Sequence, residues 1–470
     1  MNFVENNDSI WLKSREKERE FRTLECNIEV DVCVIGGGIT GISTAYYLTQ
    51  EGKKVAVLEK DRIGSKTSGG TTGKITSQHH LFYDYLIKSQ SKEFAKKYWK
   101  ANEEAIENIE KIIQAEKIDC DFKRKSAFVF TKDCAKLHEI QTEVDSVKSL
   151  GIKAKFTNEI EVLGKVEGAI EFENQAQFNP VKYVTGLANC VLKKDGEIYE
   201  NTKVVEYEKD GDGFIIMAEA DGKVRKIRAQ HVVVATRYPI FNVPGFYFLK
   251  MYQELEYGIA VKSDINLNGM YVSAEVPTIS FRDYQNAQEN YILIVGNGHK
   301  TGEKTENNGF EILENFAKTY FPGSEIVCHW NAEDSIGLDK IPYIGEYSEV
   351  RENMYVATGF KKWGMTSSNV AANLITDKIM GSKSPYEEIF NSTRLEPIKN
   401  REEMKNMLKE VGESMIMPRL KGEKGKKYCT HLGCEVSWND VTKTWDCPCH
   451  GSRYEQDGKL IEGPSVHDLE

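Results

Sequence analysis

The sequence predicts a protein of the α/β class that also has a strand-rich second region and a small all-β module at its C-terminus. Three observations support this. Residues Val30–Glu59 read as strand, glycine turn, helix and strand, residues 196–330 shift to strands and hairpins, and residues 429–450 hold four of the ten cysteines and two histidines. The chain has 470 residues, which is more than one domain with a single hydrophobic core usually contains. This length suggests roughly two to four domains.

The first predicted strand is buried on both faces, because residues 30–35 are almost entirely apolar, as in parallel sheets. The helix that follows places Ile42, Ala45 and Leu48 on one face. Val55–Leu58 then forms the second strand. This segment therefore predicts one strand–helix–strand unit of a parallel sheet.

Later segments extend the pattern. Residues 93–117 have the periodicity of a long amphipathic helix. Asp210–Gly213 is typical of a hairpin turn, and His231–Thr236 and Tyr355–Thr358 read as further apolar strands. A helix is predicted from about Thr366 to Met380.

The domain boundaries follow from changes in composition. Residues 1–27 form a polar extension with one apolar patch, which we expect to pack on the main body. The body spans residues 28–390, a linker spans 391–414, and the C-terminal module spans 415–470. Within the linker, apolar residues at helical spacing from Met404 to Val411 predict an amphipathic helix.

Composition narrows the class of protein. The apolar fraction is 40% and the charged fraction 29%, which is the profile of a globular protein in water. A net charge of −10 argues against nucleic acid as a partner, since that binding needs a basic surface.

The sequence also bears on location. Its apolar runs are too short for a transmembrane segment, and the N-terminus has neither the basic start nor the apolar stretch of a secretion signal. We therefore expect a cytoplasmic protein in which the six scattered cysteines from Cys26 to Cys328 are reduced.

The glycine turn after the first strand is a candidate dinucleotide site. Gly36 permits the tight turn, Gly38 lets a pyrophosphate approach the helix N-terminus, and Gly41 lets helix and strand pack closely. Glu59 ends the second strand, where a carboxylate accepts hydrogen bonds from ribose hydroxyls. A glycine turn with another ligand, or with none, is the alternative.

The loop after Glu59 bears on which dinucleotide binds. Residues 64–74 are rich in glycine and hydroxyl side chains, with Thr71, Thr72 and Lys74 at the end. The backbone N–H groups and hydroxyl groups of such a loop are hydrogen-bond donors that suit an extended diphosphate or the floor of a flavin pocket. A solvated loop is the alternative, since clusters of this composition are usually loops.

Residues 28–385 resemble the D-amino-acid-oxidase-like family of FAD-dependent oxidoreductases, which includes glycine and sarcosine oxidases. The resemblance rests on the glycine fingerprint, on Val232–Thr236 and on Tyr355–Met365. It implies an FAD-binding, Rossmann-like α/β domain with an α+β substrate domain interleaved with it. It also implies that FAD is the cofactor.

The resemblance further implies flavin-binding positions. Gly359, Gly364, Met365 and Thr366 belong to an element that places a helix N-terminus near the flavin pyrimidine ring. N–H groups there would stabilise negative charge on the reduced ring. By the same resemblance, Val204 occupies the position at which members of the family contact the adenine through backbone groups.

Candidate substrate residues are less specific. Arg282 lies in the sheet expected to cover the flavin and would clamp a carboxylate, while His79 and His80 follow the flavin loop. A structural hydrogen bond or ion pair is the alternative for each of the three. We interpret Asp334 and Asp339 as turn residues.

Two C-terminal loops each present one thiolate and one imidazole. Cys429-Thr-His431-Leu-Gly-Cys434 is followed, after twelve residues, by Cys447-Pro-Cys449-His450-Gly-Ser452. Two cysteines and two histidines suit a Rieske-type [2Fe–2S] centre. Structural zinc is the alternative, although zinc fingers favour cysteine pairs and histidine pairs at other spacings.

These boxes resemble those of Rieske proteins and imply a small all-β Rieske-type module. By that resemblance Cys429 and Cys447 bind one iron, and His431 and His450 bind the other. It also implies a disulfide between Cys434 and Cys449, and hydrogen bonds from Ser452 and Tyr454 that raise the cluster potential. The sequence on either side of the two boxes holds fewer strands than Rieske domains usually carry. We therefore expect the body to support the module.

The sequence thus predicts an oxidoreductase that oxidises a small amine or amino-acid-like donor and transfers electrons through FAD to an iron–sulfur cluster. Two alternatives stand beside this: reversed flow that reduces a substrate, and a redox sensor or electron-transfer adaptor without turnover. A substrate-sized cavity with Arg282 pointing in favours the enzyme. The electron acceptor is unidentified, and an oligomer is compatible with the sequence.

Overall fold

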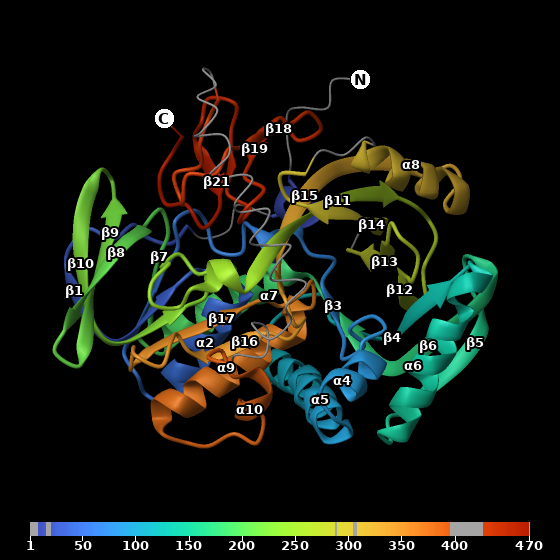
Figure 1. Cartoon of the computed structure of the whole chain (residues 1–470), viewed down its shortest axis with the longest axis horizontal. Coiled ribbons are helices and arrows are strands. Elements are labelled where there is room, and N and C mark those ends of the chain that lie inside the picture. Colours follow the sequence, from blue (N-terminus) through green and yellow to red (C-terminus); the bar gives the residue numbers. More distant parts are fainter. Residues whose placement is uncertain (1–7, 16–19, 287–288, 304–307, 395–425, 470) are drawn as a thin grey trace.

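The computed structural model describes residues 8–15, 20–286, 289–303, 308–394 and 426–469. Within these residues the chain forms three β-sheets. Two make up the body, and the third belongs to the C-terminal module (Figure 1). The predicted linker helix at Met404–Val411 lies outside the described residues.

The first sheet has a parallel core in the order β17-β10-β1-β2-β7, with antiparallel strands at its margins. In register, Val32 pairs with Val55, and Val34 pairs with Val233. The strands are β1 (Ile28–Ile35), β2 (Val55–Leu58), β7 (Glu197–Tyr199), β8 (Lys203–Asp210), β9 (Gly213–Ala220), β10 (Lys223–Val234), β16 (Tyr343–Glu346) and β17 (Met354–Thr358).

Helices cover one face of this sheet, and the main ones are α2 (Ile39–Gln50), α5 (Lys92–Glu116), α7 (Pro180–Lys193) and α9 (Gly364–Met380). α2 packs on α7 and α9, and α5 packs on α9. The apolar faces of these helices form one core with strand residues such as Val32 and Val34. Shorter helices are α3 (Thr67–Gly70), α4 (Tyr83–Ser89) and α10 (Glu387–Phe390). The predicted strand–helix–strand unit and the long helix are both confirmed.

The second sheet alternates with the first along the chain. Its order is β15-β11-β14-β13-β12-β4-β6-β3, with β5 paired to β6. The strands are β3 (Lys74–Ile75), β4 (Lys123–Thr131), β5 (Ala154–Ile160), β6 (Gly164–Gln177), β11 (Met251–Lys262), β12 (Gly269–Ser273), β13 (Ile279–Gln285), β14 (Asn290–Lys300) and β15 (Glu325–Gly337). Helices α6 (Leu137–Ser149) and α8 (Gly309–Tyr320) pack on it. This is the predicted interleaving of two subdomains.

The N-terminal extension packs on the body at a short helix, α1 (Ile10–Lys13). Ile10 and Trp11 are buried, and the Trp11 indole N–H donates to the Thr71 carbonyl at 2.7 Å. The extension thus braces the loop that precedes β3.

The C-terminal module is a four-stranded antiparallel sheet of short strands: β18 (Ser437–Asn439), β19 (Thr444–Asp446), β20 (Arg453–Tyr454) and β21 (Leu460–Glu462). It lies directly on the body, at the top in Figure 1. Lys60 donates to the Ile461 carbonyl at 2.7 Å, and Arg453 donates to Asn331 at 2.6 Å. The body therefore supports the small sheet, as expected.

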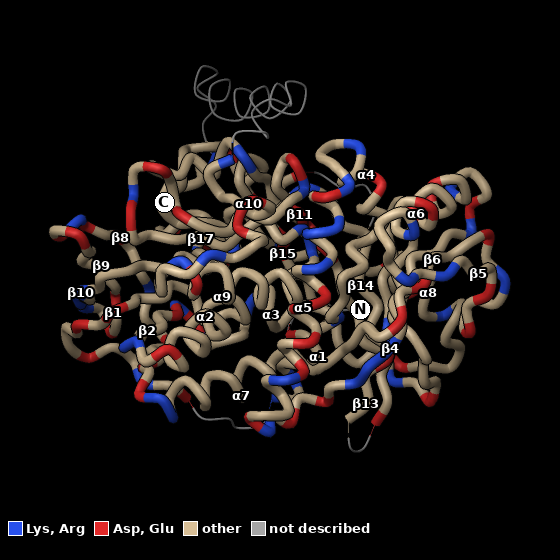
Figure 2. Tube along the Cα trace, turned by 90° about the horizontal axis from the view of Figure 1, so that it is seen from below, with Lys and Arg blue, Asp and Glu red and all other residues tan. Residues whose placement is uncertain are grey.

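Acidic and basic residues are interspersed over the molecule (Figure 2). Among the described residues, no helix has the length and apolar character needed to span a bilayer.

Candidate cofactor and substrate sites

The glycine turn between β1 and α2 is built as the fingerprint predicts. Gly36 has φ +108°, and its N–H donates to the Leu58 carbonyl at 2.8 Å. A Cβ on Gly41 would lie 1.9 Å from the Gly36 carbonyl oxygen, so only glycine lets the helix pack this closely. The N-terminus of α2 consequently points toward the end of β1, where backbone N–H groups favour an anion.

Glu59 closes the same corner. Its carboxylate accepts the Gly37 N–H at 2.7 Å and the Asp61 N–H at 2.9 Å. Burial raises the pKa of this carboxyl, although both backbone donors act to lower it. A carboxylate held on two N–H groups keeps further lone pairs for ribose hydroxyls.

One cavity of about 530 Å³ runs from this corner to the second sheet, a volume within the range of small-molecule and cofactor sites. Ten of the predicted FAD positions line it: Gly36, Gly38, Glu59, Thr71, Thr72, Lys74, Val204, Gly359, Gly364 and Met365. Gly41 and Thr366 lie beside the cavity. The Thr366 hydroxyl instead donates to the Thr76 carbonyl at 3.2 Å.

The N-terminus of α9 borders the cavity at Gly364 and Met365. α9 is tied to α2 by a hydrogen bond of 2.8 Å between the hydroxyls of Thr40 and Ser368. Two helix N-termini thus converge on one cavity, one beside Glu59 and one beside the second sheet. This arrangement fits a ligand that carries negative charge at two places.

A group of carboxylates on the second sheet faces the cavity, and the sequence interpretation missed it. Glu254 and Glu256 alternate on β11, and Asp334 lies directly opposite Glu254 on β15. Lys362 bridges the two glutamates at 2.9 and 2.8 Å. Alternating acidic residues within an otherwise buried strand were the signal available in the sequence.

Asp334 is a strand residue in this group, so its interpretation as a turn residue was wrong. The alternation of β15 turns its side chain toward the cavity instead of into a loop. Burial, together with repulsion from Glu256, raises the pKa of Asp334 to about 7. Asp339, in contrast, does lie in a turn, where its side chain accepts the Ile341 N–H and pairs with Arg394.

Two lysines along the cavity are poorly solvated. Burial, reinforced by Lys340 and Lys362, lowers the pKa of Lys361 to about 7. Burial also lowers the pKa of Lys74 well below its usual value, and the Lys74 amine donates to the Tyr271 carbonyl at 2.6 Å. These amines therefore exchange protons more readily than surface lysines.

Arg282 does not point into the cavity. Its guanidinium donates to the backbone carbonyls of Thr72, Phe178 and Asp283 at 2.5, 2.7 and 3.0 Å. It also lies over the Trp11 ring, 5.1 Å from the centroid. The structural alternative is the one observed: Arg282 anchors the loop that carries Thr72.

The two histidines differ. His79 is fully buried among Tyr98, Thr76 and Thr366, and burial lowers its pKa to about 3. His80 lines the cavity and contacts the Ser273 carbonyl at 3.1 Å. Burial lowers the pKa of His80 to about 4, so both rings are neutral at physiological pH.

The two C-terminal loops bring the four predicted cluster ligands together. The rings of His431 and His450 lie 5.0 Å apart between centroids. Cys429 and Cys447 are both buried, and a hydrogen bond from Cys447 is the main cause that lowers the pKa of the Cys429 thiol to about 6. Burial lowers the pKa of His431 to about 3 and that of His450 to about 4. Two buried thiols and two neutral imidazoles suit a soft transition-metal centre.

The two ring nitrogens of His431 show whether these loops can hold a metal. Its Nδ1 atom is buried without a hydrogen-bond partner, while its Nε2 atom lies 2.5 Å from the Asn242 side-chain oxygen. Metal-binding histidines characteristically present one nitrogen to the metal and donate the other N–H to a carbonyl or carboxylate. The donor set therefore fits a metal centre between the loops.

Cys434 and Cys449 form a disulfide that joins the two loops, as the resemblance implies. The Tyr454 hydroxyl lies 3.1 Å from the Cys429 sulfur. The histidine edge of the loops faces the body at Tyr238, whose ring makes edge contacts with His431 and His450 at 6.3 and 6.4 Å. Sequence reasoning gave no indication of Tyr238.

Comparison with known proteins decides the family. The family described as FAD dependent oxidoreductase (DAO) matches residues 31–378, and the Rieske [2Fe-2S] domain matches residues 411–470. The chain belongs to the FAD dependent oxidoreductase family. It carries a Rieske [2Fe-2S] domain at its C-terminus.

Individual proteins similar to this chain are consistent with this family assignment. The Bacillus subtilis (strain 168) protein YhfW, described as a Rieske 2Fe-2S iron-sulfur protein, is 33% identical over 96% of this chain and 94% of its own length. Gamma-glutamylputrescine oxidoreductase of Escherichia coli (strain K12) is 24% identical over 83% of this chain and 92% of its own. The structure of glycine oxidase from Geobacillus kaustophilus covers 78% of this chain and 99% of its own, with a TM-score of 0.62 and 18% identity.

As a member of this family, the protein is an oxidoreductase whose cofactors are FAD and a [2Fe–2S] cluster. The Rieske match decides between the cluster and structural zinc in favour of the cluster. The predicted family and cofactors are thus confirmed.

Proposed function

We propose that this flavoprotein oxidises a small amine or amino-acid-like donor and that the electrons reach the Rieske cluster of the same chain. The observation that carries the proposal is the single cavity that joins the glycine fingerprint, the carboxylates of β11 and β15, and residues of the C-terminal module. The name of the Escherichia coli relative, gamma-glutamylputrescine oxidoreductase, supports an amine as donor.

The residues that would hold FAD are the cavity-lining positions predicted from the fingerprint. Gly36, Gly38 and the N-terminus of α2 would receive the pyrophosphate, and Glu59 the ribose. Val204 would contact the adenine, and Gly364 and Met365 would lie beside the flavin pyrimidine ring. Cys429, His431, Cys447 and His450 would hold the cluster.

The chemistry of these groups is general: FAD takes two electrons from an organic donor, and a [2Fe–2S] cluster accepts one electron at a time. The protein supplies recognition of the donor. Glu254 and Asp334 lie opposite each other and would bind an ammonium group, while Lys362 neutralises part of the acidic charge. Partly buried carboxylates select a cation because an unpaired charge in such a site is costly.

Proton transfer would fall to Asp334. An amine must lose its ammonium proton before oxidation, and a base is efficient when its pKa lies near the operating pH. With its pKa raised to about 7, mainly by burial, the Asp334 carboxylate matches this requirement.

The route to the cluster would run through Thr236–Tyr238. Thr236 and Arg237 line the cavity, and Tyr238 contacts both cluster histidines. The cavity and the cluster site are thus connected by the three consecutive residues Thr236, Arg237 and Tyr238. Tyr238 is 1% exposed, so its side chain is shielded from water.

The test is anaerobic stopped flow of the fully loaded protein against a panel of mono- and diamines and amino acids. We expect a donor to bleach the flavin absorbance, followed by reduction of the cluster at a rate independent of protein concentration. Glu254→Gln should weaken donor binding, whereas Glu325→Gln at the end of β15 serves as a control. Flavin that is bleached by dithionite but by no donor would instead favour an adaptor.

A further inference from the structure

We infer that the C-terminal module forms part of the FAD site, so that retention of FAD and docking of the module are one coupled equilibrium. The inference rests on the placement of FAD proposed above. It adds that FAD binding involves the Rieske module as well as the FAD-binding fold.

The C-terminal module contributes part of the cavity lining. Leu460, Glu462, Gly463, Ser465 and Val466 of the module line the same cavity as Glu59 and Val204. The Lys60 amine, next to Glu59, donates to the Ile461 carbonyl at 2.7 Å. The module therefore covers the end of the cavity where the adenosine of FAD would lie.

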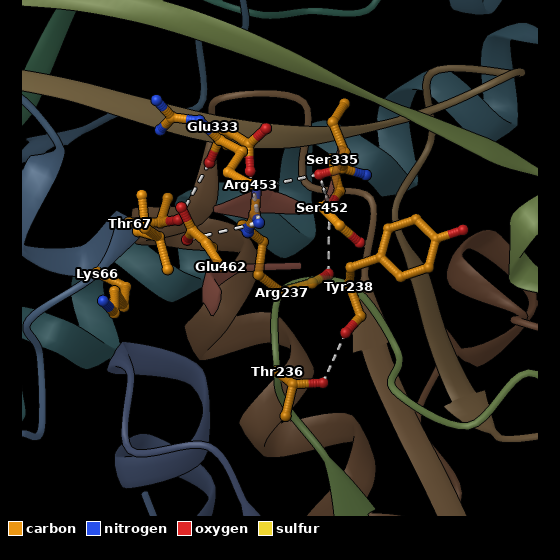
Figure 3. Close-up of polar contacts among 12 residues, drawn as sticks. Lys66, Thr67, Thr236, Arg237, Tyr238, Glu333, Ser335, Ser452, Arg453 and Glu462 are labelled. Atoms are coloured by element: carbon orange, nitrogen blue, oxygen red, sulfur yellow. Dashed lines mark hydrogen bonds and ion pairs between the residues drawn. The ribbon is translucent and has the colours of Figure 1, made fainter. Parts of the chain in front are cut away.

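A charge network crosses the interface between the module and the body, as drawn in Figure 3. Arg237 pairs with Glu333 of the body at 2.9 Å and with Glu462 of the module at 3.4 Å. Burial acts to raise the pKa of Glu462, but Arg237, Lys66 and other cations outweigh it and hold that pKa below its usual value. Breaking such a buried pair is strongly unfavourable, so the network fixes the docked position.

The backbones of the module and the body also pack closely against each other. A Cβ on Gly302 of the body would lie 2.4 Å from the Pro448 nitrogen, and a Cβ on Gly451 would lie 2.3 Å from the Gln253 side chain. Well-packed surfaces have two discrete arrangements, docked or separated, and do not slide continuously. Separation of the module would open the adenosine end of the cavity to water.

These contacts imply reciprocity. If FAD binds the docked arrangement more tightly than the separated one, FAD must favour docking to the same degree that docking favours FAD. Loss of FAD would then shift the module toward the separated arrangement. Electron transfer within the chain would be restricted to the fully loaded protein.

The experiment perturbs the interface away from the cavity. Gly302→Ala introduces the Cβ that meets Pro448, and Gly323→Ala is the matched control, because Gly323 also has a positive φ, +80° against +83°, but has open space around its Cβ. We expect FAD to dissociate from Gly302→Ala about 5- to 150-fold faster, the range typical of coupled sites. Recovery of FAD fluorescence on dilution measures this rate.

The reciprocal measurement uses the wild-type protein. Removal of FAD should increase hydrogen exchange in residues 426–469, and added FAD should restore protection. Unchanged exchange on removal of FAD would overturn the inference. A protein that holds no FAD in the cavity would instead refute the proposed placement, and a failure to oxidise amines affects only the proposed donor.

Discussion

The Tyr454 hydroxyl lies 3.1 Å from the sulfur of Cys429, and Tyr454 is fully buried on β20. A hydrogen bond to a cluster ligand withdraws electron density and stabilises the reduced state. We predict that Tyr454→Phe lowers the cluster potential by roughly 20–60 mV, which corresponds to one ordinary hydrogen bond. Redox titration followed by electron paramagnetic resonance measures the shift. Tyr428→Phe is the control, and equal potentials in both variants would exclude this role for Tyr454.

Arg282 is predicted to stabilise the fold and not to bind substrate. Arg282→Met removes the guanidinium donor from the buried carbonyls of Thr72 and Phe178, each at a cost of about 1–3 kcal/mol. The Asp283 carbonyl keeps a hydrogen bond from the Gln177 side chain at 3.1 Å. The free energy of unfolding should fall accordingly, as measured in a denaturant titration. Arg22→Met removes an exposed pair with Glu197 and should cost about 0–1 kcal/mol. A rise in KM with unchanged stability would instead show that Arg282 binds the carboxylate of a substrate.

Sequence reasoning succeeded where local chemistry decides the structure. The glycine turn, Glu59 and the loops around Cys429 and Cys447 are short motifs whose geometry depends on neighbouring residues. Arg282 and Asp334 show the limit. Both are charged residues on strands of one sheet, and which face each presents depends on register and on the elements packed against it. The contact of Tyr238 with His431 joins residues that are far apart in sequence.

Gly41 is predicted to be indispensable for FAD retention, although it does not line the cavity. Gly41→Ala places a Cβ 1.9 Å from the Gly36 carbonyl oxygen and must push α2 away from β1. Such overpacking costs about 1–3 kcal/mol, and it displaces the helix N-terminus that would receive the pyrophosphate. We expect reduced FAD content in the purified variant, and Ser43→Ala on the same helix provides the comparison. Full FAD content in Gly41→Ala would show that the turn tolerates a side chain.

The disulfide between Cys434 and Cys449 should persist under reducing conditions. Both residues are buried, at 1% and 6% exposure, so a thiolate has little access to the bond. Alkylation of the native protein in the presence of a reductant, followed by mass spectrometry, should leave both unlabelled. The exposed Cys26 and Cys134 serve as internal positive controls. Labels on Cys434 and Cys449 would show that the loops open.

Asp334 should set the pH dependence of donor oxidation. Burial and Glu256 raise its pKa to about 7, so the carboxylate is protonated below that pH and ionised above it. A raised carboxyl pKa means that the folded state binds this proton more tightly than the unfolded chain. The group therefore stabilises the fold at low pH, and that contribution is lost as the pH rises from 3.8 towards 7.

Donor oxidation follows the opposite trend, because only the ionised carboxylate binds an ammonium group or accepts its proton. The rate of flavin reduction should rise through about pH 7 in the wild type, and Asp334→Asn should abolish this rise and slow the reaction. Lys361 titrates in the same range, since burial lowers its pKa to about 7. Lys361→Met therefore separates the two groups: it should keep the rise if Asp334 causes it. A rise retained in Asp334→Asn and lost in Lys361→Met would assign the proton transfer to the lysine.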